Sequence, residues 1–373
     1  MPPARSVNLL TVNTGSSSLR LAAYAASGAR VRLLASRHYA GSSAGDDALE
    51  SFLKEESIVG VSAVAHRVVH GGSRLTAPCR IDAAVETEIR RLAPLAPLHN
   101  PAALKWIERC RALLGAAIPQ VAVFDTAFYA GLPAVAATYA LPRDLARRHG
   151  ARRFGFHGLA HEAMWQRWWA LHARPGVAVI SLQLGAGCSI TAVRDGAPVD
   201  TSMGYSPLEG LVMATRAGDI DPGLVLHLQR AEGLAPDAME RMLNEQSGLL
   251  GLSGTTGDMR RLLEDATPAA RLAVELYCYR ARKYVGAYLA ALGGAEAILF
   301  GGGVGEHAPA VRWAILGGMQ RLGIKLDEEA NRAAVGREGR ISAPGSAMDV
   351  WVVPVDEAAL LAQKAVAVLG GGN

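Results

Sequence analysis

A charged side chain inside an apolar segment is the first indication of chemistry in this sequence. Arg67 lies within the apolar run 61–69. A guanidinium at such a position needs a partner or a cleft, because an unpaired buried charge is very costly. A purely structural ion pair is the alternative. The His-Gly-Gly sequence at 70–72 follows directly, and it favours a functional site at Arg67.

An aspartate stands where a second apolar segment ends. The short run 121–125 reads VAVFD and is typical of a buried strand that stops at Asp125. Proteins of the α/β class place their chemistry at the carboxyl ends of strands. Asp125 is therefore a candidate site residue, and an aspartate that only caps the next turn is the alternative.

Two further polar side chains lie in glycine-containing segments. His157 precedes Gly158, and His161 follows four positions later. This H-x-x-x-H spacing does not favour zinc, because the glycine weakens a helix between the histidines and the H-E-x-x-H order is absent. Arg216 lies in the polar, glycine-broken segment 204–222 and has room to face a ligand; a solvated loop is the alternative.

Small-residue turns follow three apolar runs, at 13–18, 185–187 and 301–306. Backbone amides and hydroxyls in such turns can wrap a phosphate, and glycine lets the backbone approach a nucleotide. The third turn is neither a Walker A motif, which needs a Gly-Lys-Ser/Thr ending, nor a dinucleotide fingerprint. For the first turn, at 13–18, an ordinary hairpin turn without a ligand is the alternative.

The order of apolar segments predicts the scaffold that positions these residues. We expect strands at 7–13, 18–25, 61–69, 121–125, 177–184, 189–193, 297–303 and 350–357, and helices at 100–115, with Asn100 as its cap, 222–232, 268–292 and 358–368. Alternating strands and helices indicate the α/β class. Two halves that each begin with a glycine-turned hairpin, 8–23 and 178–194, suggest a duplicated fold with a cleft between the halves.

Composition excludes several classes of protein. The 373 residues suggest two to three domains, and a hydrophobic content of 50% excludes a disordered chain. The net charge of +4 is spread along the chain without a basic tract, so we expect no nucleic-acid partner. The 41 glycines exceed the usual share of about 7% but are not periodic, which excludes collagen.

The cysteines and the apolar stretches indicate in which cellular compartment the protein is expected. The four cysteines form no C-x-x-C pair, so a reducing compartment fits best. The N-terminus shows no secretory signal. The uncharged segment 175–193 is long enough for a membrane helix, but its central glycines and polar residues favour two strands joined by a turn.

Nine segments, taken in order, point to one family. They are 12–20, 66–72, 95–101, 123–129, 152–158, 204–223, 247–260, 300–306 and 352–360. Together they resemble the acetate kinases of the acetate and sugar kinase/Hsp70/actin superfamily. The resemblance implies an α/β fold of two duplicated actin-like (ribonuclease H-like) domains with an interdomain cleft. It also implies a cytoplasmic homodimer that does not act at a membrane, and reversible phosphoryl transfer from ATP to acetate with Mg²⁺ or Mn²⁺. The expected domains are 1–129 with 359–373, closed by the C-terminal helix, and 130–358, which binds nucleotide and dimerises.

The resemblance also assigns roles by motif. The expected catalytic residues are Arg67, Asp125, His157 and Arg216. The carboxylate and its methyl group would contact Arg67, Val69, Leu98, Phe156 and Pro207. The nucleotide would contact Arg20, Gln183, Leu184, Gly185, Ala186, Gly187, Asp258, Met259, Arg260, Gly302, Gly303, Val304, Gly305 and Glu306. Asn13 and Glu357 would place the metal, with Asp125 near it.

This chemistry is consistent with the residue types. Donor phosphate and acceptor carboxylate are both anions, and two arginines, a histidine and Mg²⁺ would offset their repulsion. A carboxylate is already ionised at pH 7, so no general base is required. We therefore interpret Asp125 as a metal or water positioner, although the residues alone also allow a base.

The chain departs from the family pattern mainly in its expected nucleotide-binding motifs. Gln183 and Ala186 stand where the family usually has His and Asn, and Arg20 stands for Lys. Gly301, His307 and Asp356 replace Thr, Asn and Asn. The residues expected to contact the acid match the family pattern. We therefore expect the departures to affect the affinity for the phosphoryl donor, or its identity, more than the acid substrate. A propionate or other short-chain carboxylate kinase, and a non-catalytic actin-like nucleotide-binding protein, are the alternative functions.

Overall fold

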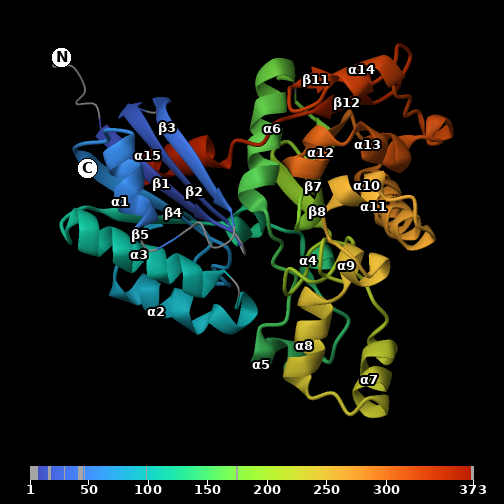
Figure 1. Cartoon of the computed structure of the whole chain (residues 1–373), viewed down its shortest axis with the longest axis horizontal. Helices are drawn as coiled ribbons and strands as arrows, with labels where there is room; N and C mark the ends of the chain where they lie inside the picture. Colours follow the sequence, from blue (N-terminus) through green and yellow to red (C-terminus); the bar gives the residue numbers. More distant parts are fainter. Residues whose placement is uncertain are drawn as a thin grey trace. The chain divides into compact units, whose positions relative to one another are not determined.

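The chain divides into two compact units. The computed structural model describes residues 7–15, 18–28, 30–40, 45, 47–97, 99–173 and 175–370. Unit 1 is Met1–Ala130 together with Asp356–Asn373, and unit 2 is Gly131–Val355. The C-terminal segment of the sequence, red in Figure 1, therefore belongs with the N-terminal strands in unit 1.

Unit 1 is built on a six-stranded mixed sheet. Its strands, in spatial order, are β3 (Arg30–Ala40), β2 (Ser18–Ser27), β1 (Val7–Thr14), β4 (Val61–Val68), β6 (Gln120–Phe124) and β5 (Cys79–Arg80). Strands β1 to β3 form an antiparallel meander, β1, β4 and β6 run parallel, and β5 is antiparallel to β6. Because β1, β4 and β6 are parallel neighbours, their carboxyl ends reach one edge of the sheet.

Helices bury the faces of this sheet. They are α1 (Ala48–Glu55), α2 (Ala83–Arg91), α3 (Asn100–Leu114), α15 (Glu357–Gly370) and the 3₁₀ turns Ala93–Leu95 and Asp125–Tyr129. Helix α15 packs against β1, β4 and β6. Phe52 of α1 and Trp106 of α3 join Leu10 and Leu21 of the sheet in one buried cluster.

Unit 2 repeats the strand order of unit 1. Its strands, in spatial order, are β11 (Gly339–Arg340), β12 (Asp349–Val352), β10 (Ala297–Gly301), β7 (Ala178–Leu184), β8 (Cys188–Arg194) and β9 (Ala197–Thr201). Again three strands form an antiparallel meander, β7, β10 and β12 run parallel, and a two-residue strand adds antiparallel to the last. Each strand of one unit thus has a counterpart of the same direction in the other. The predicted duplicated α/β fold is confirmed.

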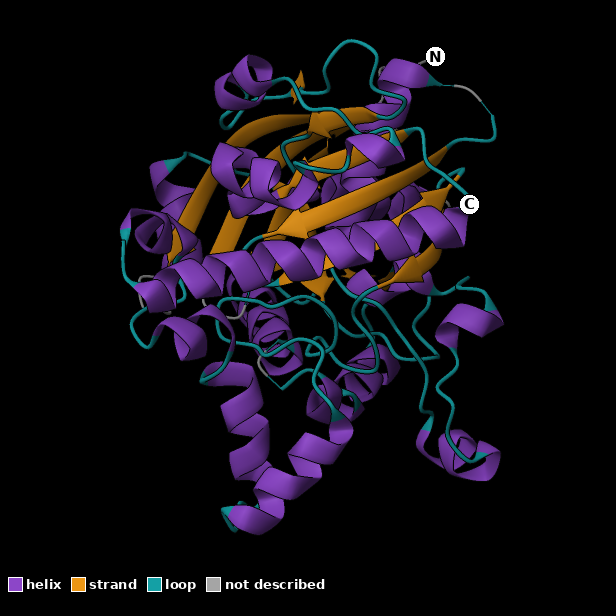
Figure 2. Ribbon diagram, turned by 90° about the vertical axis from the view of Figure 1, so that its right-hand side faces the viewer, coloured by secondary structure: helices purple, strands orange, loops and turns teal. Residues whose placement is uncertain are grey.

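The helices of unit 2 are more numerous. They are α4 (Ala134–Ala137), α5 (Arg143–His149), α6 (Gly158–His172), α7 (Pro222–Ala231), α8 (Pro236–Glu245), α9 (Gly248–Ser253), α10 (Met259–Glu264), α11 (Pro268–Leu292), α12 (Gly302–His307), α13 (Pro309–Leu316), α14 (Glu328–Ala333) and the 3₁₀ turn Gln320–Leu322. The long helix α11 packs against β7, β8 and β9 (Figure 2). The uncharged segment 175–193 forms most of the β7–β8 hairpin. Within the described ranges, no helix is both long and apolar enough to cross a bilayer.

Three details of the predicted elements are wrong. The strand expected at 297–303 ends at Gly301, because Gly302 adopts a positive φ of 76° and begins α12. The strand expected at 350–357 ends at Val352, and Pro354, which lacks an N–H, stands in the coil before α15. The side chain of Asn100 does not cap α3; it binds the backbone N–H and C=O of His70 at 3.1 and 3.0 Å. Asn100 thereby holds the turn that follows β4.

Candidate active site

Arg67 and Asp125 form a buried ion pair at the carboxyl edge of the unit 1 sheet. The two residues stand at the ends of the neighbouring strands β4 and β6. Arg67 Nη2 lies 2.6 Å from Asp125 Oδ2, and Nε lies 3.1 and 3.2 Å from the two carboxylate oxygens. The Asp125 side chain is fully buried and that of Arg67 is 10% exposed. Burial by itself lowers the pKa of Arg67, but the carboxylates of Asp125 and Glu357 outweigh it, so the pKa is raised.

Asn13 and Glu357 complete this cluster. Arg67 Nη1 donates to Asn13 Oδ1 at 3.1 Å, and Asn13 Nδ2 donates to Glu357 Oε2 at 2.6 Å. Arg67 Nη1 also lies 3.7 Å from Glu357 Oε2. Residues separated by 344 positions in the sequence therefore meet at one edge of the sheet. We call Asn13, Arg67, Asp125 and Glu357 the unit 1 cluster.

The unit 1 cluster contains oxygen donors of the kind that Mg²⁺ binds. Mg²⁺ is usually held by one or two carboxylates, with water and phosphate oxygens completing its shell. Glu357 Oε2 is held by Asn13, while the Glu357 side chain keeps 14% exposure. No group of three or more His, Cys, Asp or Glu side chains that could hold a metal occurs in the described part of the chain. The carboxylate of Glu357, with the side chain of Asn13 beside it, is the group of this cluster that would hold such an ion.

Two other expected residues of unit 1 stand beside members of the cluster, one in the strand register and one along the sequence. Arg20 is exposed and stands directly opposite Asn13 in the β1–β2 register, which places both side chains on one face. Val69 is 4% exposed and directly follows β4. Leu98 lies outside the described residues.

In unit 2, His157, Gly187 and Arg216 meet around the β7–β8 turn. A Cβ at Gly187 would lie 3.1 Å from His157 Nε2 and 3.7 Å from Arg216 Nη1. His157 adopts a positive φ of 56° as the N-cap residue of α6, and its Nδ1 lies 2.9 Å from Ser189 Oγ. A side chain at position 187 would fit only if the His157 ring moved by a few tenths of an ångström, whereas its contact with Arg216 would be an ordinary one. We call His157 and Arg216 with the turn 185–187 the unit 2 cluster.

Arg216 differs from Arg67 in having no acidic partner among the described residues. Its Nη1 donates to the carbonyl of Pro207 at 3.0 Å and lies 3.6 Å from Met213 Sδ. The residue is 8% exposed, and burial lowers its pKa, with no carboxylate of the described ranges acting against this effect. A nearly buried arginine without a counter-ion is suited to bind an anion that comes from outside the chain.

The loop that carries Arg216 is held by side chains that were not expected from the sequence. Asp219 Oδ1 accepts from the backbone N–H of Gly210 at 2.8 Å, and Asp219 Oδ2 accepts from the hydroxyl of Tyr284 at 2.7 Å. Glu209 binds the hydroxyl of Tyr139 and pairs with Arg153. These contacts fix the loop at residues 209–210 and 219, on either side of Arg216. Pro207, which precedes them, is partly buried. Phe156, the residue before His157, is 1% exposed.

The expected nucleotide loops converge on the end of β7. A Cβ at Gly302 would lie 2.6 Å from the carbonyl of Leu184 and 2.8 Å from Gln183 Nε2. The backbone N–H of Ala214 donates to the carbonyl of Ala186 at 3.0 Å. A Cβ at Gly257 would lie 2.7 Å from the carbonyl of Ala214, which brings the segment before α10 to the same loop.

Side chains near these loops have partners within the protein. Asp258 caps α10 through the backbone N–H of Arg260 and also pairs with the exposed Arg260 guanidinium, while Met259 is buried. Glu306 Oε1 accepts from the backbone N–H groups of Gly302 and Val355 at 2.9 and 3.2 Å. Glu306 thus fixes the glycine turn. Gly303 and Val304 keep some exposure, and Gly305 is buried.

Arg312 of α13 is a supporting residue that the sequence analysis missed. It is fully buried and donates to the carbonyls of Gly305, Glu306, Asn331 and Ala334 and to Asn331 Oδ1. Burial lowers its pKa to about 10. It therefore anchors the C-terminal end of the glycine helix α12. An arginine inside the apolar run PAVRWAIL is the sequence signal that would have indicated it.

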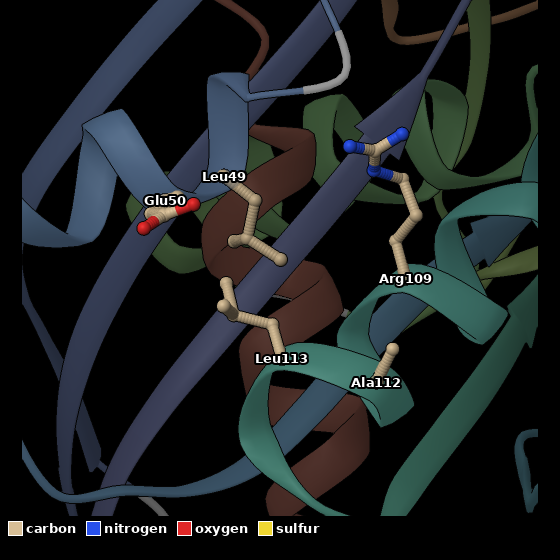
Figure 3. A pocket seen from close by; sticks show the side chains of 5 residues that line it. All are labelled: Leu49, Glu50, Arg109, Ala112 and Leu113. Carbon is tan, nitrogen blue, oxygen red and sulfur yellow. The ribbon is translucent and has the colours of Figure 1, made fainter.

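A separate pocket lies in unit 1 between α1 and α3. It is lined by Leu49, Glu50, Arg109, Ala112 and Leu113 (Figure 3). None of these residues belongs to either cluster, so we assign the pocket no part in the chemistry.

Two units with the same strand order, each with a glycine-containing hairpin turn, are the architecture of the actin-like phosphotransferases. Comparison with known proteins narrows this class. The model of the Acetokinase family matches residues 30–363. An acetate kinase of Chloroherpeton thalassium is 49% identical over 83% of this chain and 76% of that protein.

Solved structures agree with the sequence relatives. The acetate kinase of Porphyromonas gingivalis superposes with a TM-score of 0.85 at 35% identity, covering 98% of this chain and all of that one. A propionate kinase of Francisella tularensis superposes with a TM-score of 0.85 at 34% identity, covering 96% of this chain and 98% of that one. The chain belongs to the acetokinase family, a family of kinases that transfer a phosphoryl group to a carboxylate. This confirms the resemblance found in the sequence.

Proposed function

We propose that this protein transfers the terminal phosphoryl group of ATP to acetate, reversibly, and forms acetyl phosphate and ADP. The observation that carries the proposal is Arg216, a nearly buried guanidinium with no carboxylate partner in the part of the chain that the structure describes, beside His157 and the turn 185–187. Relatives named acetate kinase at 44–49% identity support acetate as the acceptor rather than a longer acid.

Each cluster would supply cationic side chains that suit the electrostatics of this reaction. Phosphate and carboxylate repel each other as they approach, and positioned cations offset that repulsion. Arg216 and His157 would contact the moving phosphoryl group, and the turn 185–187 would present backbone N–H groups to the donor phosphates. Arg67 would orient the acetate carboxylate, and Asp125 would hold Arg67 in place. Acetate arrives ionised, so no residue has to remove a proton.

Asn13 and Glu357 would hold Mg²⁺, or Mn²⁺ in its place. When bound, the ion would neutralise charge on the donor phosphates. Removal of divalent metal with EDTA should therefore abolish turnover, and either ion should restore it.

A hydroxamate assay tests the proposal. Acetate, propionate and butyrate are offered separately, each with ATP and with pyrophosphate as donor. We expect acetyl hydroxamate to form fastest, and only with ATP. Failure of all three acids with either donor would contradict the assignment.

The assembly and location are further parts of this proposal. We infer a cytoplasmic homodimer from membership in the family. Light scattering of the purified chain measures the mass in solution, and a single protomer mass would contradict the dimer.

Val69 is expected to limit the size of the acid. It is buried directly after β4, two residues from Arg67. If Val69 forms the wall of the acyl pocket, Val69→Ala should raise kcat/KM for propionate and butyrate relative to acetate. We expect a shift of about tenfold for each methylene accommodated. An unchanged order of the acids in the same hydroxamate assay would place the wall elsewhere.

We expect this chain to bind or use ATP less well than a version that has the usual His and Asn of the family at positions 183 and 186. The side chain of Ala186 cannot form a hydrogen bond, and Gln183 Oε1 is buried without a hydrogen-bond partner among the described residues. A hydrogen bond to a charged group is worth about 1.5–3 kcal/mol. The double variant Gln183→His/Ala186→Asn should therefore raise kcat/KM for ATP several-fold to about a hundredfold. Steady-state kinetics at saturating acetate and Mg²⁺ measure the change, and no gain would mean that neighbouring groups already compensate.

A further inference from the structure

Four side chains of unit 2 form a continuous line of hydrogen bonds that ends at His157. His157 Nδ1 lies 2.9 Å from Ser189 Oγ. The same oxygen lies 2.7 Å from His161 Nε2, and His161 Nδ1 lies 2.9 Å from Ser181 Oγ. The line runs from α6 to β8, back to α6 and on to β7. Of these four residues, only His157 is an expected catalytic residue. The other three are therefore candidates for a role in supporting it.

The interior of this line is closed to solvent. Ser181, Ser189 and His161 are each 0% exposed. Burial lowers the pKa of His161 to about 3, so its ring is neutral at pH 7. A neutral imidazole has one N–H donor and one acceptor nitrogen. His161 therefore donates to one serine and accepts from the other.

Met164 indicates the direction of the line. Its thioether sulfur lies 3.7 Å from Ser181 Oγ and can only accept a hydrogen bond. If the Ser181 hydroxyl donates to this sulfur, Ser181 Oγ accepts from His161 Nδ1–H. His161 Nε2 then accepts the hydroxyl proton of Ser189. Ser189 Oγ in turn accepts from Nδ1–H of His157.

His157 is also restrained by its backbone and by its neighbour. It adopts a positive φ of 56°, which is uncommon for a residue with a side chain. Its Nε2 lies 3.1 Å from the position that a Cβ at Gly187 would take. With Nδ1 engaged by Ser189, Nε2 is the ring nitrogen that faces the turn expected to hold the donor phosphates.

We infer that Ser189 and His161 are positioning residues for the phosphoryl transfer: they hold the His157 ring and direct its Nε2 at the moving group. The inference rests on the proposed function, which assigns that contact to His157. In this arrangement His157 donates Nδ1–H to Ser189 in both of its charge states. A second proton can therefore enter at Nε2, where the phosphoryl group is expected, without any rearrangement of the line.

Steady-state kinetics of variants at Ser189 and His161 test the inference. Ser189→Ala removes the acceptor for Nδ1–H, so kcat should fall roughly 10- to 100-fold while KM for acetate changes little. Loss of that acceptor destabilises the imidazolium form, so the limb of the pH–rate profile that reports His157 should move to lower pH. His161→Leu should behave similarly, whereas His161→Gln, which can still accept from Ser189, should retain more activity.

A matched control comes from the neighbouring strand β9. Thr201 is 1% exposed, and its hydroxyl lies 3.0 Å from that of Thr191 and donates to the carbonyl of Ile190 at 3.3 Å. Thr201→Val removes a buried hydroxyl of the same sheet that bonds to none of the four members of the line, so its kcat and pH profile should match the wild type. The inference is overturned if Ser189→Ala and His161→Leu keep the kcat and pH profile of Thr201→Val.

An independent readout separates this inference from the proposed function. Nitrogen spectra of ¹⁵N-histidine-labelled protein should show His161 neutral, with its proton on Nδ1, from pH 8 to pH 5. A proton on Nε2 would reverse the line and overturn the inference. Absence of kinase activity in the wild type would instead contradict the proposed function, and the spectra would still test the line.

Discussion

Replacement of Arg216 by alanine should lower kcat for acetate phosphorylation about a hundredfold or more, the loss expected when a transition-state donor is removed. Arg216 is the cleaner of the two arginine tests. Its described partners are a carbonyl and a thioether, so its removal leaves no buried carboxylate without a counter-ion. The fold should therefore survive the change with little loss of stability.

Two further variants decide what Arg216 contributes. Arg216→Lys retains the charge but loses the fork that allows bidentate contact, so most of the deficit should remain. Arg230→Ala removes an exposed arginine of α7 in the same unit and should leave kcat unchanged. Steady-state kinetics and urea unfolding are measured on all three. Near-normal kcat in Arg216→Ala would refute the role given to this residue.

The unit 1 cluster shows why so much of the site could be predicted. Arg67 and Asp125 each stood out as a charge within or at the end of an apolar run, and such runs became β4 and β6. Parallel neighbouring strands bring their carboxyl ends to one edge. The meeting of the two residues thus follows from the fold class. The approach of Glu357 depends instead on the return of α15 to unit 1, which only the resemblance indicated.

The line behind His157 shows what could not be predicted. Its two serines lie on β7 and β8 and its second histidine on α6, so their distances depend on the register of the sheet and on how α6 packs against it. A single sequence gives neither. Strand β3 was missed for another reason: its arginines at 30, 32 and 37 hide the apolar alternation, as is common for an edge strand protected by charge.

Replacement of Arg67 by alanine should damage both activity and stability, and the two effects can be separated. The loss of a cation at the acceptor carboxylate should lower kcat by on the order of a hundredfold. The same change removes a guanidinium that is hydrogen-bonded to fully buried Asp125. Breaking a buried ion pair from one side costs roughly 3–5 kcal/mol. The free energy of unfolding should therefore fall, although the chain still folds.

The double variant Arg67→Ala/Asp125→Ala provides the decisive comparison. Removing Asp125 as well eliminates the buried carboxylate that had lost the Arg67 guanidinium, so part of the lost unfolding free energy should return. Activity should not return, because the guanidinium that orients acetate is still absent and Asp125, itself an expected catalytic residue, is lost as well. Urea unfolding and kcat are measured for the wild type, the single variant and the double variant. Recovery of kcat together with stability would show that Arg67 serves the fold alone, and the acceptor-binding role would have to pass to another cation.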